Sequence, residues 1–216
     1  MTATPWHWAL TDDYPAFCLT FARGLDPHAL LRRYGAHSGD PRVLTEQESI
    51  AEPPADASLL RAGTVDGWAF CFETRGVQGW TAHVLTEVSR DTESFTVMRA
   101  GALHAVSHWQ NGQKREAFEP GTPYSFDPNH SHLLWNAVRA RLEQPRPVPS
   151  FLAALDAVSE HIGGSLTESA IEGPLLTVVL PEPASVLPEA TAGHEGLGRC
   201  LGTLAPPPPS RDPESR

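Results

Sequence analysis

Apolar residues recur at helical spacing near the start of the chain. Over residues 11–24, Tyr14, Phe17, Cys18 and Phe21 fall at positions i, i+3, i+4 and i+7. This spacing places four apolar side chains on one face of a helix. The pattern therefore predicts that the chain opens with a helix.

Helix-capping signals follow this first segment. A second helix is predicted to begin at Pro27, with Asp26 as its cap and Gly35 just past its end. Thr45 and Glu48 have the spacing of a capping box, which predicts a short third helix. The first fifth of the chain is thus expected to be helical.

The pattern then changes to strands. Leu59–Thr64 and Trp68–Glu73 read as two strands joined by a tight turn at Asp66-Gly67. Large aromatic residues alternate with small ones along the second strand, as in a strand that packs one face into a core. We interpret this row as core packing, with a stacking platform for a ligand as the alternative. The aromatic face holds Trp68, Phe70 and Phe72, and the other face holds Ala69, Cys71 and Glu73.

Helices and strands continue to alternate irregularly to residue 180. The strongest local signal is the Asn111-Gly112 pair between two alternating segments, which favours a hairpin with a type I′ turn. The mixture predicts an α+β fold, a mostly antiparallel central sheet flanked by helices. The remaining expected elements are a helix through Val84–Val88, strands at Ser94–Met98, Leu103–Gln110, Gln113–Phe118 and Leu175–Leu180, and helices starting at Asp127-Pro128, at Ser150 (ending at Gly163) and at Thr167.

The apolar pattern stops after residue 180. Residues 181–216 hold eight prolines and almost no apolar periodicity. Such a segment cannot bury enough surface to offset its ordering entropy. We therefore predict one folded domain over residues 1–180 and a disordered, proline-rich tail over residues 181–216.

Charge and cysteine content limit the classes of function that the sequence supports. The net charge is −10, and only Arg32-Arg33 and a trio of arginines at 139, 141 and 146 approach a basic cluster. Nucleic-acid binding is not expected without a basic stripe. The three cysteines are widely spaced and no apolar run reaches the ~20 residues of a membrane span. Both features are typical of a cytoplasmic protein that does not bind a membrane.

Familiar catalytic motifs are absent from the sequence. It has no phosphate-binding loop, no G-x-S-x-G elbow and no H-E-x-x-H pair. His104 and His108 share a strand face but lie too far apart along it to hold one ion. His130 and His132 would point to nearly opposite sides of a helix. We expect neither a metal nor a cofactor.

Five residues remain as candidate binding residues. Glu73 ends an apolar strand and precedes a glycine-containing loop that carries Arg75 and Trp80. A desolvated carboxylate there would orient a ligand or act as a general base. The simpler interpretation is a solvated carboxylate paired with Arg75. The face that carries His104 and His108 suits a protein contact or ordinary solvent exposure.

Two longer segments carry a family resemblance. FCLTFARGLDPHALLRRYG at 17–35 and VDGWAFCFETRGVQGW at 65–80 resemble an actinobacterial domain family of unknown function. FEP at 118–120 and LTESAIEGPLLTVVL at 166–180 are similar to that family in placement, so the resemblance extends from about residue 6 to residue 180. It implies a compact cytoplasmic domain and supplies no catalytic residues.

Two functional hypotheses follow. The first is a non-catalytic, cytoplasmic protein-binding or adaptor domain in a bacterial conflict or regulatory system, with another protein as its partner. It rests on the missing motifs, the acidic surface and the six tryptophans, because tryptophan is favoured at protein interfaces. The alternative is a small-molecule enzyme with a site near Glu73 that only the fold assembles.

Overall fold

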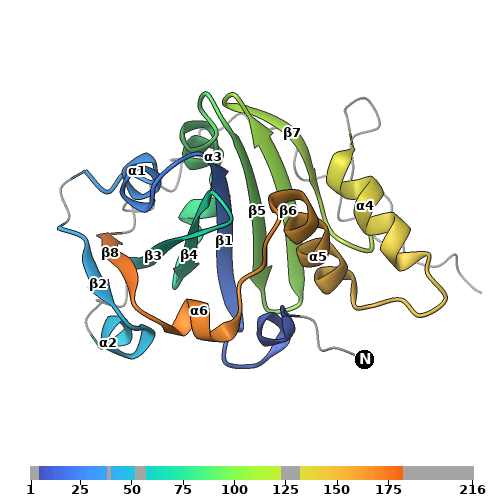
Figure 1. The fold of residues 1–216 in the computed structure, drawn as a ribbon, viewed down its shortest axis with the longest axis horizontal. Coiled ribbons are helices and arrows are strands. Elements are labelled where there is room, and N and C mark those ends of the chain that lie inside the picture. The colour runs from blue at the N-terminus through green and yellow to red at the C-terminus, as the bar shows by residue number, and fades with distance from the viewer. Residues whose placement is uncertain (1–4, 38–39, 52–56, 123–131, 182–216) are drawn as a thin grey trace, which may run out of the picture. The chain divides into compact units, whose positions relative to one another are not determined.

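The computed structural model describes residues 5–37, 40–51, 57–122 and 132–181. These residues form an eight-stranded sheet in the order β2-β8-β3-β4-β1-β5-β6-β7, with helices against it (Figure 1). All neighbouring strands in it are antiparallel, so the predicted α+β fold is confirmed. The elements are η1 (His7–Leu10), β1 (Ala16–Arg23), α1 (Pro27–Arg33), β2 (Arg42–Leu44), α2 (Glu46–Ile50), β3 (Ala57–Val65), β4 (Trp68–Thr74), η2 (Gln78–Trp80), α3 (Ala82–Val88), β5 (Glu93–Ala100), β6 (Leu103–Gln110), β7 (Gln113–Phe118), α4 (Leu133–Leu142), α5 (Ser150–Ile162), α6 (Glu168–Glu172) and β8 (Leu175–Pro181).

The helix predicted over residues 11–24 is wrong. Ala16–Arg23 forms β1, which lies between β4 and β5 in the sheet. Phe17 and Phe21 are four residues apart, a spacing that puts two side chains on one face of a helix and of a strand alike. Both faces of β1 are buried, so its apolar run lacks the polar alternation that marks a half-exposed strand.

Both predicted hairpins are confirmed. β3 and β4 join at Asp66-Gly67, and β6 and β7 join at Asn111-Gly112. The φ angles of these four residues are 45°, 81°, 53° and 73°. Positive φ at both central positions defines a type I′ turn, whose twist matches that of the strands it joins.

The predicted caps at Asp26 and Thr45 are also confirmed, and Thr167, the expected start of a helix, caps α6. The side chains of Asp26, Thr45 and Thr167 each accept a hydrogen bond from the backbone N–H three residues on. Thr45 and Glu48 complete the capping box. Ser150, the expected start of a helix, is the first residue of α5; the preceding Pro149 is at the N-cap position, and no side chain caps that helix.

Two predictions concern residues that lie at or beyond the ends of the described ranges. Asp127-Pro128, the predicted start of a helix, lies outside them, and the described helix α4 begins at Leu133. β8 ends at Pro181, the last described residue. The domain boundary near residue 180 and the disorder of the tail stay predictions.

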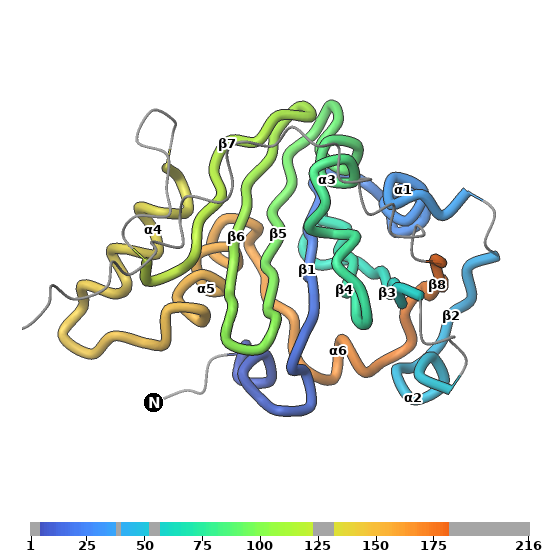
Figure 2. The backbone as a smooth tube through the Cα atoms, turned by 180° about the vertical axis from the view of Figure 1, so that it is seen from behind, coloured from blue at the N-terminus to red at the C-terminus, as the bar shows by residue number. Residues whose placement is uncertain are grey.

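Each face of the sheet carries its own apolar core. The larger core lies under α4, α5 and α6 and contains Trp68, Phe70 and Phe72, so the core interpretation of that strand is confirmed. The smaller core lies under α1 and α3 and contains Ala69 and Cys71. α5 lies in front of the sheet in Figure 1 and α4 lies beside β7, whereas α3 lies in front of the sheet in Figure 2. Among the described residues, no helix is both long enough and apolar enough to cross a membrane.

Candidate functional site

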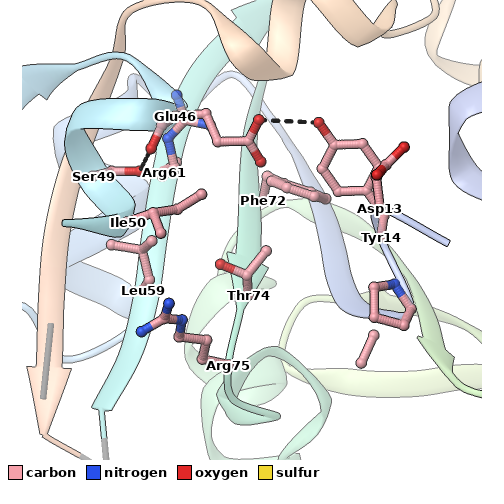
Figure 3. A pocket seen from close by; sticks show the side chains of 12 residues that line it. Asp13, Tyr14, Glu46, Ser49, Ile50, Leu59, Arg61, Phe72, Thr74 and Arg75 are labelled. Carbon is pink, nitrogen blue, oxygen red and sulfur yellow. Dashed lines mark hydrogen bonds between the residues drawn. The ribbon is translucent and has the colours of Figure 1, made fainter. Parts of the chain in front are cut away.

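A hollow of about 330 Å³ opens beside α2, where β3 and β4 approach the edge of the larger core (Figure 3). We call it the α2 pocket. Four separate segments of the chain contribute to it. It is lined by Asp13, Tyr14, Pro15, Ala16, Glu46, Ser49, Ile50, Leu59, Arg61, Phe72, Thr74 and Arg75.

Strand pairing supplies the floor of the α2 pocket. Leu59 pairs with Thr74 and Arg61 pairs with Phe72 across β3 and β4. Paired residues, and residues two apart on a strand, point to the same face of a sheet. These four side chains therefore share the face that carries the larger core, and Leu59 and Phe72 are buried there.

Tyr14 and Glu46 form one wall. The Tyr14 hydroxyl donates to Glu46 Oε2 at 3.1 Å, the contact drawn between them in Figure 3. Burial raises the pKa of Tyr14, and the negative charge of Glu46 raises it further, so the phenol stays protonated. Ser49 Oγ donates to the backbone carbonyl of Glu46 at 2.6 Å. The wall is thus tied to the capped helix α2.

Arg61 is a buried cation behind this wall. Its side chain is 1% exposed, and its guanidinium donates to the backbone carbonyls of Ile171, of Gly173 at 2.7 Å and of Leu44 at 3.3 Å. Burial lowers its pKa, while the charge of Glu46 opposes that shift. Because arginine titrates far above neutral pH, the guanidinium remains charged. Arg61 therefore joins β3 to the segments around α6 and β2.

Asp13 and Arg75 are exposed at the mouth of the pocket. Arg75 follows the end of β4 and has φ of 63°, a left-handed conformation that is uncommon outside glycine. Of the five residues predicted to bind, Arg75 is the one that lines the α2 pocket. Arg75 is positively charged and Asp13 is negatively charged. These opposite charges at the mouth of the pocket would orient a polar or charged group that enters it.

Glu73 has a different place. It lies on the opposite face of β4 and is 0% exposed, so the interpretation of a solvated carboxylate is wrong. Its two carboxylate oxygens accept hydrogen bonds from the backbone N–H groups of Gln78 and Gly79, both at 2.7 Å. The carboxylate thus caps η2 and fixes the loop that follows β4.

The glycines of this loop fit closely around Glu73. A Cβ at Gly76 would lie 2.6 Å from Glu73 Oε1 and would overlap Ser58 Oγ. A Cβ at Gly79 would lie 2.6 Å from the Tyr34 hydroxyl oxygen. Neither distance is one that a real side chain adopts. The E-x-x-G-x-x-G spacing of residues 73–79 is therefore a structural unit in which the backbone folds over a buried carboxylate.

The remaining predicted binding residues lie elsewhere. Trp80 is partly buried in η2. His104 stacks on Phe151 of α5, with ring centroids 4.3 Å apart. His108 is 7% exposed, stacks on Phe95 and lies 3.0 Å from Glu93. His108 is therefore buried within the domain, so solvent exposure at this position is wrong, whereas His104 is partly exposed beside α5 and its contact with a partner protein stays a prediction. The described side chains contain no cluster of three or more His, Cys, Asp or Glu residues suited to hold a metal ion.

Sequence reasoning missed Tyr14, Glu46 and Arg61 as pocket residues. A charged residue inside the apolar segment LLRAG was an available signal at Arg61, because a buried charge needs dedicated partners. Tyr14 and Glu46 carried no such signal, since they are 32 residues apart and meet only in the fold.

Comparison with known proteins identifies the family to which the chain belongs. The family of unknown function DUF6461 matches residues 2–139. The chain belongs to this family. The match includes every residue of the α2 pocket and ends within α4, whereas the resemblance read from the sequence reached residue 180. No curated protein and no solved structure matches the chain.

A second hollow of this DUF6461 domain adjoins the α2 pocket. It has a volume of about 270 Å³ and lies along β2, β8 and β3. Ser49 and Leu59 line both hollows, so the two hollows lie on either side of these residues. Exposed apolar side chains occur on the same elements: Ile50 of α2 is 49% exposed and Val43 of β2 is 65% exposed.

Proposed function

We propose that this protein is a non-catalytic binding or adaptor domain that holds a segment of a partner protein at the α2 pocket. The observation that carries the proposal is the pair of adjoining hollows on either side of Ser49 and Leu59. Two neighbouring hollows with apolar floors suit an extended segment that inserts two side chains. Such anchors supply most of the affinity in protein interfaces.

The chemistry of the α2 pocket favours an apolar anchor. Leu59 and Phe72 offer apolar surface, and the exposed side chain of Ile50 would be covered by a bound partner. Glu46 and the two Nη atoms of Arg61 make hydrogen bonds within the domain, whereas the buried Nε of Arg61 has no hydrogen-bond partner among the described residues. Burial of apolar area therefore supplies the affinity, and charges at the mouth set the orientation.

The alternative of an enzyme centred on Glu73 receives less support. Both oxygens of Glu73 are occupied by backbone N–H groups. Glu73 lines neither hollow, and no histidine or cysteine lines either one. A general base must reach the proton that it removes. Binding without covalent chemistry is the function that this arrangement supports best.

Capture experiments with matched variants test the proposal. Tagged wild-type protein is used to capture partners from a lysate of its host, in parallel with Ile50→Asp and Leu103→Asp variants. Ile50 and Leu103 are both 49% exposed, but Leu103 lies on β6 and lines neither hollow. We expect Ile50→Asp to abolish capture of a partner that wild type and Leu103→Asp both retain.

The contact itself is then mapped. A photoreactive residue at position 50 should cross-link to that same partner, because Ile50 lies at the proposed contact. Equal capture by all three proteins, or equal loss in both variants, would contradict a partner site at the α2 pocket.

A further inference from the structure

A cleft of about 570 Å³ lies between the ends of α1 and α3. It belongs to the helices that cover the smaller core, and it shares no lining residue with the α2 pocket. Its lining is unusual for a chain with a net charge of −10, because basic side chains dominate it. The charged and imidazole residues of the cleft are Arg32, Arg33, His37, His83, Glu87 and Arg90.

Arg33 is held in place at the wall of this cleft. Its Nη1 donates to the backbone carbonyls of Glu87 at 3.2 Å, Val88 at 3.0 Å and Arg90 at 2.6 Å. These carbonyls lie at the C-terminal end of α3, where the helix dipole is negative and favours a cation. Nε and Nη2 of Arg33 form no hydrogen bond with any described residue. A fixed guanidinium thus keeps a two-donor edge, which matches two oxygens of one anion.

Positive charge exceeds negative charge around Arg33. Burial lowers its pKa, the nearby charge of Arg90 lowers it further, and Asp91 opposes the shift. Arg90 forms an ion pair with Glu87. The cleft lining thus holds three guanidinium groups and one carboxylate, that of Glu87, with Asp91 as a further negative charge near Arg33. Within the described residues the side chain of the exposed Arg32 has no hydrogen-bonding partner. An anion would relieve this excess of charge.

We propose that the cleft binds the phosphate group of a small molecule, with Arg33 and Arg32 as its principal donors. Arginine forks bind phosphate bidentately, and the imidazoles of His37 and His83 add further donors at the cleft wall. Pockets of about 300–1,000 Å³ accommodate small organic ligands. The cleft therefore has room for the organic part of a phosphate monoester as well as for the phosphate. This site is independent of the proposed partner site, because different elements form it.

Isothermal titration calorimetry at constant ionic strength tests the proposal, with inorganic phosphate and ribose 5-phosphate as probes and chloride as the background anion. We expect saturable binding of at least one probe. Arg32→Ala should weaken it by about 10-fold, the effect of losing one charge-assisted contact. Arg33→Lys should weaken it similarly, because lysine keeps the charge but lacks the fork. Tighter binding of ribose 5-phosphate would assign the larger part of the cleft to the organic group, and equal binding would assign the site to phosphate alone.

Arg139→Ala is the matched control, since Arg139 is an exposed arginine of α4 that pairs with Glu143 and does not line the cleft. It should bind both probes like wild type. If Arg33→Lys does not fold, the comparison of Arg32→Ala with Arg139→Ala decides the result. Absence of saturable binding, or an equal effect of Arg32→Ala and Arg139→Ala, would overturn the proposal.

Discussion

Replacing Glu73 should destabilise the domain strongly, although its position at a strand end gives no sign of this. The Glu73 carboxylate is 0% exposed and accepts two backbone hydrogen bonds of 2.7 Å. In Glu73→Ala both N–H groups lose their acceptor. An unsatisfied buried donor costs roughly 1–3 kcal/mol. The expected loss in the free energy of unfolding is therefore about 1–3 kcal/mol from the buried N–H of Gly79, with a smaller further loss from the part-buried N–H of Gln78.

Glu73→Gln separates the hydrogen bonds from the volume of the side chain. The amide oxygen can accept from one N–H group, but the amide nitrogen then faces the other, and two donors cannot bond. We expect about half of the alanine effect. The exposed Glu143 provides the control, and Glu143→Ala should change stability by less than about 0.5 kcal/mol.

Urea unfolding followed by circular dichroism measures these free energies. Hydrogen exchange at the amides of Gln78 and Gly79 provides a second, local measurement. Both amides should be protected in wild type and should lose protection in Glu73→Ala. If both Glu73 variants unfold within about 0.5 kcal/mol of wild type and both amides stay protected, Glu73 does not hold this loop.

Three further predictions use the same unfolding measurements. Trp68→Ala should cost about 3–5 kcal/mol, because it removes a buried indole from the larger core; an unchanged urea midpoint would contradict its place there. Gly76→Ala should also be destabilising, because its Cβ would lie 2.6 Å from the carboxylate beneath the loop; wild-type stability would refute the tight fit. Burial, and then the charge of Glu73, raises the pKa of the Cys18 and Cys71 thiols. As pH rises, the thiols of the unfolded chain therefore lose their protons before those of the folded chain, so the free energy of unfolding should be fully retained below about pH 8.5 and should fall above it. A Cys18→Ala, Cys71→Ala double variant should show a smaller fall in the free energy of unfolding over the same pH range. An equal fall in wild type and the double variant would contradict this origin.

Elements set by local chemistry could be predicted from the sequence. A type I′ turn needs two residues that tolerate positive φ, and Asn111-Gly112 meets that need without reference to the rest of the chain. The caps at Asp26 and Thr45 are local in the same sense. β1 could not be predicted in this way. Its neighbours in the sheet come from β4 and β5, and only these distant contacts distinguish its apolar run from a helix.

The candidate site was less accessible to prediction for the same physical reason. Arg75 could be proposed because it follows a recognisable strand. Tyr14 and Glu46 become neighbours only after β1 and α2 are in place. Glu73 could be named as a candidate from its place after an apolar strand, but its role depends on the path of the loop that folds back over it. Sequence spacing identifies such a residue, and only the fold shows whether its partner is a ligand or the backbone.

Two buried charges on neighbouring strands explain how the α2 pocket keeps its shape. Arg61 of β3 and Glu73 of β4 point to opposite faces of the sheet and do not form a pair with each other. Arg61 donates to backbone carbonyls around α6 and β2, and Glu73 accepts from backbone N–H groups of the loop after Arg75. Burying each charge costs free energy, and its hydrogen bonds to backbone groups offset that cost. The same hydrogen bonds hold irregular backbone segments in place next to the pocket. A pocket whose surrounding loops are already ordered loses less entropy when a partner binds. This rigidity, maintained from both faces of one hairpin, supports the binding role that we propose for the α2 pocket.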